Sequence, residues 1–346
     1  MEINPGARKS AALVLINPKA GMKANVATNT AGRPEVEAAL RHAGVAYRVL
    51  EPASAEESTR MARDAARDGV SLVIAAGGDG TVQTVAFALL GSQTAMGIMP
   101  LGSFNNVSRS LDIPRDLAAA AAIVAEGATT WINVGKVGEQ RFLESAGIGF
   151  DAAIMPHSNA LGEGNLRSAS AALKVMFTFR RGSVYLTLDG QRMRARAFMV
   201  VVANAPYSLA GLSIAPTAKM DDHLFDIVVY ERFRRIELIV SLVGLLFHRP
   251  FPMNKVRIYR AHRVLVAGRR AWPIQADSHL CGTTPATIEL DEHLLRVVHG
   301  PYAAVANGGG AGKWWEPAGV ATEALGGRAG RDKQNVQLAS DIRDAS

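Results

Sequence analysis

The stretch with the clearest chemical meaning is Gly77-Gly78-Asp79-Gly80-Thr81, which follows an apolar run and precedes a helical pattern. Glycines let the backbone turn tightly and approach a ligand without Cβ atoms in the way. The next helix would direct its free N–H groups and positive dipole end towards a phosphate. Because Asp79 would repel phosphate by itself, we expect it to hold a Mg²⁺ ion. The alternative is a plain turn in which Asp79 or Thr81 caps the helix.

Two further loops with glycine and polar residues follow predicted strands. One is Asn17-Pro18-Lys19-Ala20-Gly21, and the other runs from Pro100 to Asn106. Because the carboxyl ends of parallel strands meet at one edge of a sheet, we expect all three loops to lie together. Three such loops are hard to explain as turns alone, and they predict a phosphate site. They match neither the Walker A loop nor the GxGxxG fingerprint.

The elements that must position these loops form an alternating pattern in the first third of the chain. Apolar runs predict strands at Ala11–Ile16, Val45–Leu50, Ser71–Ala76 and Ala95–Met99. Helices are predicted between and after them, from Pro34 to Gly44, from Ser54 to Gly69, at Thr81–Leu90 and at Arg115–Glu126. This order is typical of a doubly wound parallel sheet with helices on both faces.

After about Thr130 the pattern changes to short β-type segments, which predict an antiparallel sandwich or barrel. The expected strands are Trp131–Val137, Arg141–Ala146, Val184–Leu188, Ala195–Ala203, Leu224–Tyr230, Val256–Tyr259, Val264–Ala267, Ala286–Leu290 and Leu294–Val298. Helices are expected at Ser168–Phe179 and Arg234–Phe247. We therefore divide the chain into an α/β domain (1–130), a β-rich domain (131–306) and a flexible tail (307–346). We leave open whether the last residues of the β-rich domain fold back into the α/β domain.

Composition narrows the functional classes. The chain has 346 residues, of which 48% are hydrophobic and 20% charged, and a single cysteine, Cys281. It can therefore bury a sizeable core, and a disulfide framework is excluded. We expect no membrane-spanning segment, because no apolar run reaches roughly 18 residues. We also expect no signal peptide, because no cleavage-site pattern follows the short apolar stretch Ala11–Ile16. These features indicate a cytoplasmic protein.

Charge is concentrated in one part of the chain. The net charge is +7, yet the stretch Arg180–Arg270 has 16 Lys and Arg against 6 Asp and Glu, a local +10. This excess predicts an anionic partner such as a membrane surface. The 12-residue apolar stretch Ile236–Phe247 lies within it and is either a core helix or one that lies among lipid headgroups. No helix-turn-helix or aromatic-interleaved pattern accompanies the basic residues, so nucleic acid is not an expected partner.

Together the motifs resemble those of the diacylglycerol kinase-like lipid kinases, which include bacterial diacylglycerol kinases, sphingosine kinases and ceramide kinases. The resemblance runs from about Ser10 to Pro301. It rests on Asn17–Gly21, Gly77–Thr81, Pro100–Asn105, Gly147–Asp151, Ala215-Pro216 with Asp221-Asp222, and Asp277. It implies an α/β nucleotide domain followed by a β-rich domain, with the active site between them.

The resemblance also implies roles for individual residues. Contacts to ATP would come from Asn17, Pro18, Lys19, Ala20, Gly21, Gly77, Gly78, Asp79, Gly80, Thr81, Val82, Gln83, Gly102, Ser103 and Asn105. Asp79 would act through Mg²⁺ on the phosphates. A structural metal would bind the Asp222 side chain and the carbonyls of Lys219 and Leu224. Asp277 would be the base that activates the lipid hydroxyl.

Three positions depart from the family pattern. Where the family has Thr-Gly-Asn-Asp, this chain has Ser103-Phe104-Asn105-Asn106, so a carboxylate is missing at Asn106. His223 replaces a glycine of the metal loop, which disfavours a turn with positive φ. The family's Asp-Gly-Glu is Asp277-Ser278-His279 here. On an extended segment Asp277 and His279 would face the same side, and His279 could serve as a second base.

The sequence thus predicts an ATP- and Mg²⁺-dependent lipid kinase that transfers a γ-phosphoryl group to the hydroxyl of diacylglycerol or of a sphingoid- or ceramide-like lipid. We expect peripheral association with a membrane, through anionic headgroups. Two alternatives are a catalytically silent relative that binds lipid or nucleotide, and an NAD kinase, which shares the Gly-Gly-Asp-Gly-Thr loop. A homodimer is also left open.

Overall fold

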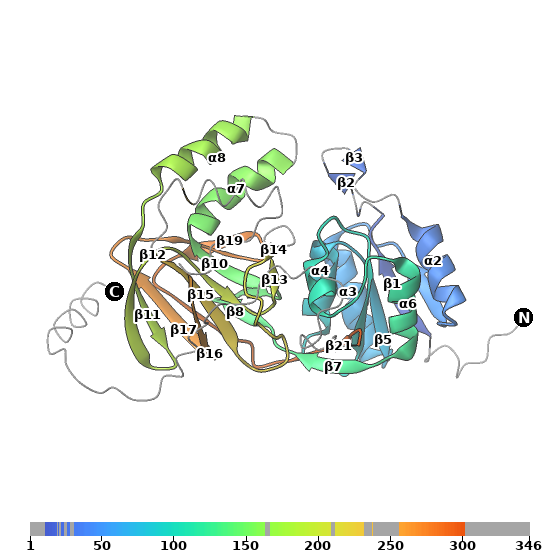
Figure 1. Ribbon diagram of the computed structural model, residues 1–346. Coiled ribbons are helices and arrows are strands. Elements are labelled where there is room, and N and C mark those ends of the chain that lie inside the picture. The colour runs from blue at the N-terminus through green and yellow to red at the C-terminus, as the bar shows by residue number, and fades with distance from the viewer. Residues whose placement is uncertain are drawn as a thin grey trace, which may run out of the picture. The chain divides into compact units, whose positions relative to one another are not determined.

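The computed structural model describes residues 11–18, 20, 22–23, 26–27, 31–162, 167–208, 212–231, 237 and 256–301. Its strands form two large sheets (Figure 1). The described helices include none with both the length and the apolar character that a membrane crossing requires. The expected helix at Arg234–Phe247, apart from position 237, and the tail from 307 lie outside the described residues.

The first sheet is built from six strands in the order β4-β1-β5-β6-β21-β7. They are β1 (Ala12–Ile16), β4 (Tyr47–Leu50), β5 (Leu72–Gly77), β6 (Ala95–Pro100), β7 (Thr129–Ile132) and β21 (Leu295–Val298). All neighbouring pairs are parallel except β21 with β7, which is antiparallel. Every residue of β1 and β6 is buried, as the continuous apolar runs predict for strands covered on both faces.

Helices cover both faces of this sheet. They are α2 (Arg33–His42), α3 (Ala55–Arg67), α4 (Asp79–Leu89), α5 (Asn106–Ser110) and α6 (Leu117–Glu126). The pair α3 and α4 packs on one face, and the pair α2 and α6 on the other (Figure 1). Side-chain caps start two of them, since Ser54 accepts from the N–H of Glu57 and Asp116 from that of Ala119. The predicted doubly wound α/β domain is confirmed.

The second sheet has 11 antiparallel strands, and its described core is separate from that of the first. The strands are β8 (Gly135–Val137), β9 (Gln140–Phe142), β10 (Ser145–Gly149), β11 (Gly182–Leu188), β12 (Gln191–Ala203), β15 (Phe225–Glu231), β16 (Val256–Ala261), β17 (Arg263–Gly268), β18 (Pro273–Ala276), β19 (His279–Thr283) and β20 (Ala286–Leu290). The long strand β12 pairs with β11 along its first half and with β10 and β15 along its second. The predicted antiparallel β-rich domain is confirmed.

Shorter elements complete the fold. These are the helices α7 (Phe150–Gly162) and α8 (Arg167–Thr178) and the short strands β2 (Met22–Lys23), β3 (Val26–Ala27), β13 (Tyr207–Ser208) and β14 (Leu212–Ser213). Helix α8 matches the helix expected at Ser168–Phe179. Helix α7 was not predicted, and it contains Pro156, a residue that normally opposes a helix interior.

Two predicted strands are each interrupted. The stretch Trp131–Val137 is divided between β7 and β8, which belong to different sheets, because the N–H of Asn133 donates to the carbonyl of Met220 instead of to a strand. The stretch Arg141–Ala146 breaks between β9 and β10 at Leu143 and Glu144. The N–H groups of these two residues bond to a side chain, which the next subsection describes.

The chain returns to the first sheet at its end. β21 lies between β6 and β7, with Val297 opposite Met96 on one side and Thr130 on the other. The first sheet therefore includes a strand from the region that the sequence assigns to the second domain.

Candidate functional site

The three glycine-containing loops lie at one edge of the first sheet, as predicted. Parallel pairing places Ile16 beside Ala76 and Gly77 beside Pro100, so β1, β5 and β6 end next to one another. The N–H of Asn17 donates to the carbonyl of Ala76 at 3.0 Å, and Asn17 Nδ2 donates to Thr81 Oγ1 at 3.2 Å. Pro18 and Ala20 continue this loop, while Lys19 and Gly21 lie outside the described residues.

Glycine is required where the second and third loops meet. A Cβ atom on Gly102 would lie 2.5 Å from the Cα atom of Gly78, closer than any real contact. Asn105 holds the third loop in place, because its Oδ1 accepts from the N–H of Gly102 at 2.9 Å and its Nδ2 donates to the carbonyl of Gly102 at 2.8 Å. Asn105 has φ of 52°, a conformation that asparagine tolerates better than most residues. The two loops thus approach closely enough to form one backbone-lined surface.

Asp79 is the first residue of α4 and reaches the start of α5. Its Oδ1 accepts from the N–H of Val107 at 3.4 Å. Burial raises the pKa of Asp79, and backbone N–H groups at the start of α5 oppose that rise. The carboxylate therefore connects the second and third loops, in addition to any role towards a ligand.

Asp277 lies in a tight turn between β18 and β19, and its side chain is buried. Its Oδ2 accepts from the N–H of Leu143 at 2.6 Å and from Gln83 Nε2 at 3.1 Å. Its Oδ1 accepts from the N–H groups of Glu144 at 2.9 Å and Ser145 at 3.0 Å. Because Gln83 belongs to α4, this bond links the glycine loop and its helix to the second sheet.

Burial raises the pKa of Asp277 to about 7, against the effect of the backbone N–H groups of Leu143, Ser145 and Glu144. The negative charge of Asp79 acts in the same direction as burial, so the two carboxylates lie within electrostatic reach of each other. Two residues that the sequence predicted for the site, one from each sheet, are thus brought together.

The expectation that Asp277 and His279 face the same side is wrong. Asp277 and Ser278 both have positive φ, of 44° and 67°, so the segment is a hairpin turn and not an extended strand. His279 is exposed, and its Nδ1 lies 3.0 Å from the carbonyl oxygen of Asp277. The role of His279 as a base stays a prediction without the geometric support that the sequence suggested.

Glu144 is a buried carboxylate that the sequence analysis missed. Its side chain lies near Asp277 and Asp79, and Asn106 Nδ2 donates to its Oε2 at 2.9 Å. Burial raises the pKa of Glu144 well above its ordinary value, and the charges of Asp277 and Asp79 raise it further. One signal was present in the sequence, because Glu144 is a lone charge among Phe142, Leu143 and Ala146.

The loop Lys219–Leu224 is held by protein groups. Asp222 Oδ1 accepts from the N–H of Leu224 at 3.1 Å, and its Oδ2 pairs with Arg260. Arg260 also donates to Asp226 at 3.1 Å. The expectation that His223 opposes a positive-φ turn is wrong, since His223 adopts φ of 57°, which histidine tolerates better than most residues. A metal bound by Lys219, Asp222 and Leu224 stays a prediction.

Nowhere in the described part of the chain do three His, Cys, Asp or Glu side chains converge closely enough to hold a metal ion by themselves. Mg²⁺ in phosphate sites is usually bound by one or two carboxylates together with water and phosphate oxygens. An ATP site therefore does not require a metal site in which every ligand comes from the protein.

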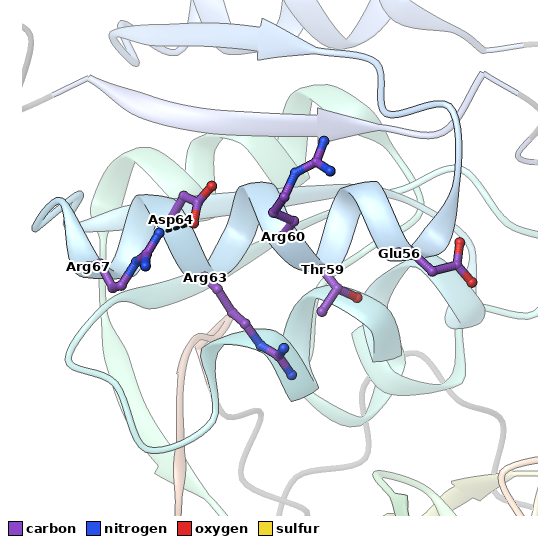
Figure 2. Close-up of a pocket in the computed structure, with 6 residues that line it drawn as sticks. All are labelled: Glu56, Thr59, Arg60, Arg63, Asp64 and Arg67. Carbon is purple, nitrogen blue, oxygen red and sulfur yellow. Dashed lines mark hydrogen bonds and ion pairs between the residues drawn. The ribbon is translucent and has the colours of Figure 1, made fainter.

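A pocket lies elsewhere, on the surface of α3 (Figure 2). It is lined by Glu56, Thr59, Arg60, Arg63, Asp64 and Arg67, and Arg67 pairs with Asp64 within it. None of the three loops contributes to this pocket, and we assign it no function.

Comparison with known proteins agrees with this arrangement. Residues 11–137 match the family model of the diacylglycerol kinase catalytic domain. Residues 144–299 match that of the YegS C-terminal NAD kinase beta sandwich-like domain. A protein of Chromohalobacter salexigens named "Probable lipid kinase YegS-like" is 30% identical over 261 residues, which cover 72% of this chain and 83% of that protein. The chain belongs to the diacylglycerol kinase-like lipid kinase family.

Other members of this lipid kinase family are also similar. The diacylglycerol kinase of Bacillus subtilis is 27% identical over 250 residues, covering 69% of this chain and 82% of that protein. The crystal structure of a diacylglycerol kinase from Bacillus anthracis superposes with a TM-score of 0.63 at 22% identity, covering 84% of this chain and 97% of that one. The kinase family and the two-part fold predicted from the motifs are confirmed.

Proposed function

We propose that this lipid kinase transfers the γ-phosphoryl group of ATP to a lipid hydroxyl, with Mg²⁺ as cofactor and diacylglycerol as the first acceptor to test. The observation that carries the proposal is the position of Asp277. Its side chain, from the second sheet, hydrogen-bonds to Gln83, which lies on the helix that follows the glycine loop of the first sheet. The loop that we expect to bind phosphate and a buried carboxylate therefore adjoin at one place.

The glycine loops would position the phosphates of ATP. Phosphoryl transfer depends mainly on positioning and on neutralising the phosphate charge, and little on covalent help from the protein. The residues present fit Mg²⁺: the charges of Asp277 and Asp79 raise the pKa of Glu144, the charge of Asp79 raises that of Asp277, and a cation would relieve this repulsion. Bound near Asp79, Mg²⁺ would offset charge on the phosphates.

Asp277 is our proposed base for the acceptor hydroxyl. Its pKa of about 7 lies in the range where a general base works efficiently near neutral pH. Its four hydrogen-bond donors hold the carboxylate in one orientation. To take up a proton, Asp277 would have to release one of these four donors, and we expect it to be Gln83, whose 3.1 Å bond is the longest of the four.

The proposal is tested by incubating the purified protein with radiolabelled ATP and MgCl₂ in mixed micelles that contain dioleoylglycerol, ceramide or sphingosine. NAD and water serve as alternative acceptors. We expect label in the lipid phosphate product, and a loss of about 10²-fold or more in kcat for Asp79→Asn. Transfer to NAD would identify an NAD kinase. ATP binding without turnover on any acceptor would identify a catalytically silent relative.

The choice of base is tested with two more variants. Asp277→Asn is expected to remove lipid phosphorylation, whereas His279→Ala is expected to change kcat by less than about 3-fold, because His279 is exposed. A loss of about 10²-fold or more for His279→Ala, with activity retained in Asp277→Asn, would assign the base to histidine instead. Circular dichroism of Asp277→Asn is needed as a control, because Asp277 also binds three backbone N–H groups.

A further inference from the structure

Glu144 is a buried carboxylate to which neither the sequence motifs nor the family resemblance assigns a role. It lies between β9 and β10, with 6% of its surface exposed. Removing a carboxylate from water is costly unless it gains partners or a ligand. The position of Glu144 beside the proposed phosphate site therefore needs a physical explanation.

The hydrogen-bond partner of Glu144 is the residue at which this chain departs from its family. Asn106 takes the place of the last Asp in the Thr-Gly-Asn-Asp pattern, and its Nδ2 donates to Glu144 Oε2 at 2.9 Å. The two residues are 38 positions apart in the sequence. Position 106 thus lacks the carboxylate of the family pattern, but residue 106 is in direct contact with another carboxylate, that of Glu144.

Unpaired polar atoms gather around the same residue. Among the described residues, four of the seven buried side-chain polar atoms without a hydrogen-bond partner belong to Asn106, Asn133 and Asn204. The N–H of Asn204 donates to the carbonyl of Glu144 at 2.9 Å, and Asn204 Nδ2 donates to the carbonyl of Asn133 at 3.0 Å. Asn106, whose Oδ1 is one of the four atoms, is 4% exposed and bonded to the Glu144 side chain. Such atoms mark places where water, an ion or a ligand completes the bonding.

We propose that Glu144 supplies to the cation and phosphate site the carboxylate that Asn106 lacks. With a cation bound, the negative charge would stand on Glu144 instead of on residue 106, and the Asn106 amide orients Glu144 by donating to it. Asp79 accepts from the N–H of Val107, the residue after Asn106, and Asp277 accepts from the N–H of Glu144, so Glu144 adjoins both acids of the proposed site. The inference rests on the proposed function for the identity of the ligand, ATP with Mg²⁺.

Moving the charge between the two positions tests the proposal. Glu144→Gln removes the charge but keeps the size and an oxygen that can accept from Asn106. We expect it to lower kcat for lipid phosphorylation about 10²-fold or more. The double variant Asn106→Asp/Glu144→Gln returns the carboxylate to position 106, and we expect kcat within about 10-fold of the wild type. Glu139→Gln, an exposed acid nearby, is the matched control and is expected to leave kcat unchanged.

A second measurement does not depend on turnover. Binding of Mn²⁺, as a paramagnetic substitute for Mg²⁺, is followed by electron paramagnetic resonance in the absence of nucleotide and lipid. We expect Glu144→Gln to weaken Mn²⁺ binding at least about 10-fold and the double variant to restore it. A purely structural role for Glu144 would leave Mn²⁺ binding unchanged in every folded variant.

Two outcomes would overturn the proposal. One is wild-type kcat and Mn²⁺ binding in Glu144→Gln. The other is a folded double variant whose kcat and Mn²⁺ binding stay far below those of the wild type, a result that decides the case even if Glu144→Gln alone does not fold. If the wild type phosphorylates no lipid, the proposed function fails, whereas the Mn²⁺ series still determines whether Glu144 contributes to a cation site.

Discussion

At the residue scale, some of the buried carboxylates have no ion pair among the described residues, unlike Asp226 and Asp291, which pair with arginines. Asp151, in the first turn of α7, is the clearest case outside the proposed phosphate site. Its Oδ2 accepts from Gln275 Nε2 at 2.7 Å, and a Cβ on Gly147 would collide with that same oxygen. Burial raises the pKa of Asp151 to about 6. The glycine of this motif therefore makes room for a buried acid.

Asp151 is expected to make the stability of the protein depend on pH. Its pKa rises from 3.8 to about 6 on folding, so the folded state holds the proton more tightly than the unfolded state. The free energy of unfolding should therefore fall as the pH rises from about 4 to about 6 and then level off. Asp151→Asn removes this loss and should be more stable than the wild type at pH 8 by about 1–3 kcal/mol.

Urea unfolding at pH 4.5 and pH 8 measures this difference. At pH 4.5 the gap between Asp151→Asn and the wild type should become much smaller than at pH 8. Asp68→Asn, at an exposed aspartate after α3, serves as the control and should follow the wild type at both values. The same pH dependence in Asp151→Asn as in the wild type would contradict the expectation.

At the element scale, the turn between β18 and β19 determines where Asp277 points. Both turn residues, Asp277 and Ser278, have positive φ. Such turns match the twist of the flanking strands, and they favour glycine because side chains crowd the backbone there. Ser278 stands where the family pattern has that glycine. The turn therefore keeps its shape at a conformational cost.

Ser278→Gly is expected to stabilise the protein by about 1 kcal/mol, because glycine avoids the steric cost of the left-handed conformation. The backbone N–H at 278, which donates to Gln275 Oε1 at 2.7 Å, is kept in the variant. Thermal unfolding should show a higher midpoint, with kcat within about 2-fold of the wild type. Ser278→Ala keeps the steric cost of the left-handed conformation, so its unfolding midpoint should not rise above that of the wild type. An equal gain in both variants would mean that the turn conformation is not the cause.

At the scale of the whole molecule, the chain passes from the first sheet to the second and then back to the first. The chain leaves the first sheet after β7, builds the second sheet, and returns as β21 between β6 and β7. Leu295 and Val297 of β21 are fully buried in the core of the first sheet. The first sheet is therefore complete only after the second has been synthesised, and we expect the first sheet to be unstable without β21.

The uneven charge of the chain belongs to this scale as well. We propose that the basic stretch Arg180–Arg270, with its local +10, draws the enzyme to anionic lipid surfaces. Binding to vesicles that contain phosphatidylglycerol should weaken at least about 10-fold between 50 and 300 mM NaCl, since charges in water are screened over about 8 Å at physiological ionic strength. Sedimentation with vesicles measures this, and phosphatidylcholine vesicles are the control. Binding that salt does not change would indicate apolar contact instead, and no binding would count against a membrane-bound substrate.

The sequence by itself determined the features that depend on neighbouring residues. The apolar run Ala11–Ile16 predicted a buried parallel strand, which the structure confirms at Ala12–Ile16, whereas the phosphate loop predicted from the glycines around Asp79 stays a prediction. From the rule that parallel strands end at one edge, these local patterns also predicted that the three loops meet. Residue types and short spacings were sufficient because each of these patterns is completed within one strand, loop and helix.

Only the tertiary structure decided how the acids are combined. Glu144 meets Asn106 across 38 positions, and Asp277 binds the N–H group of Leu143 across 134. The sequence pattern of a strand or helix does not predict such pairings. Each partner lies in an element whose apolar and polar pattern is the same whether or not the other partner is present. The left-handed turn at Asp277 likewise separated it from His279, since a side chain's direction follows from φ and ψ and not from residue spacing. The path of the folded chain therefore decides which carboxylates share the site.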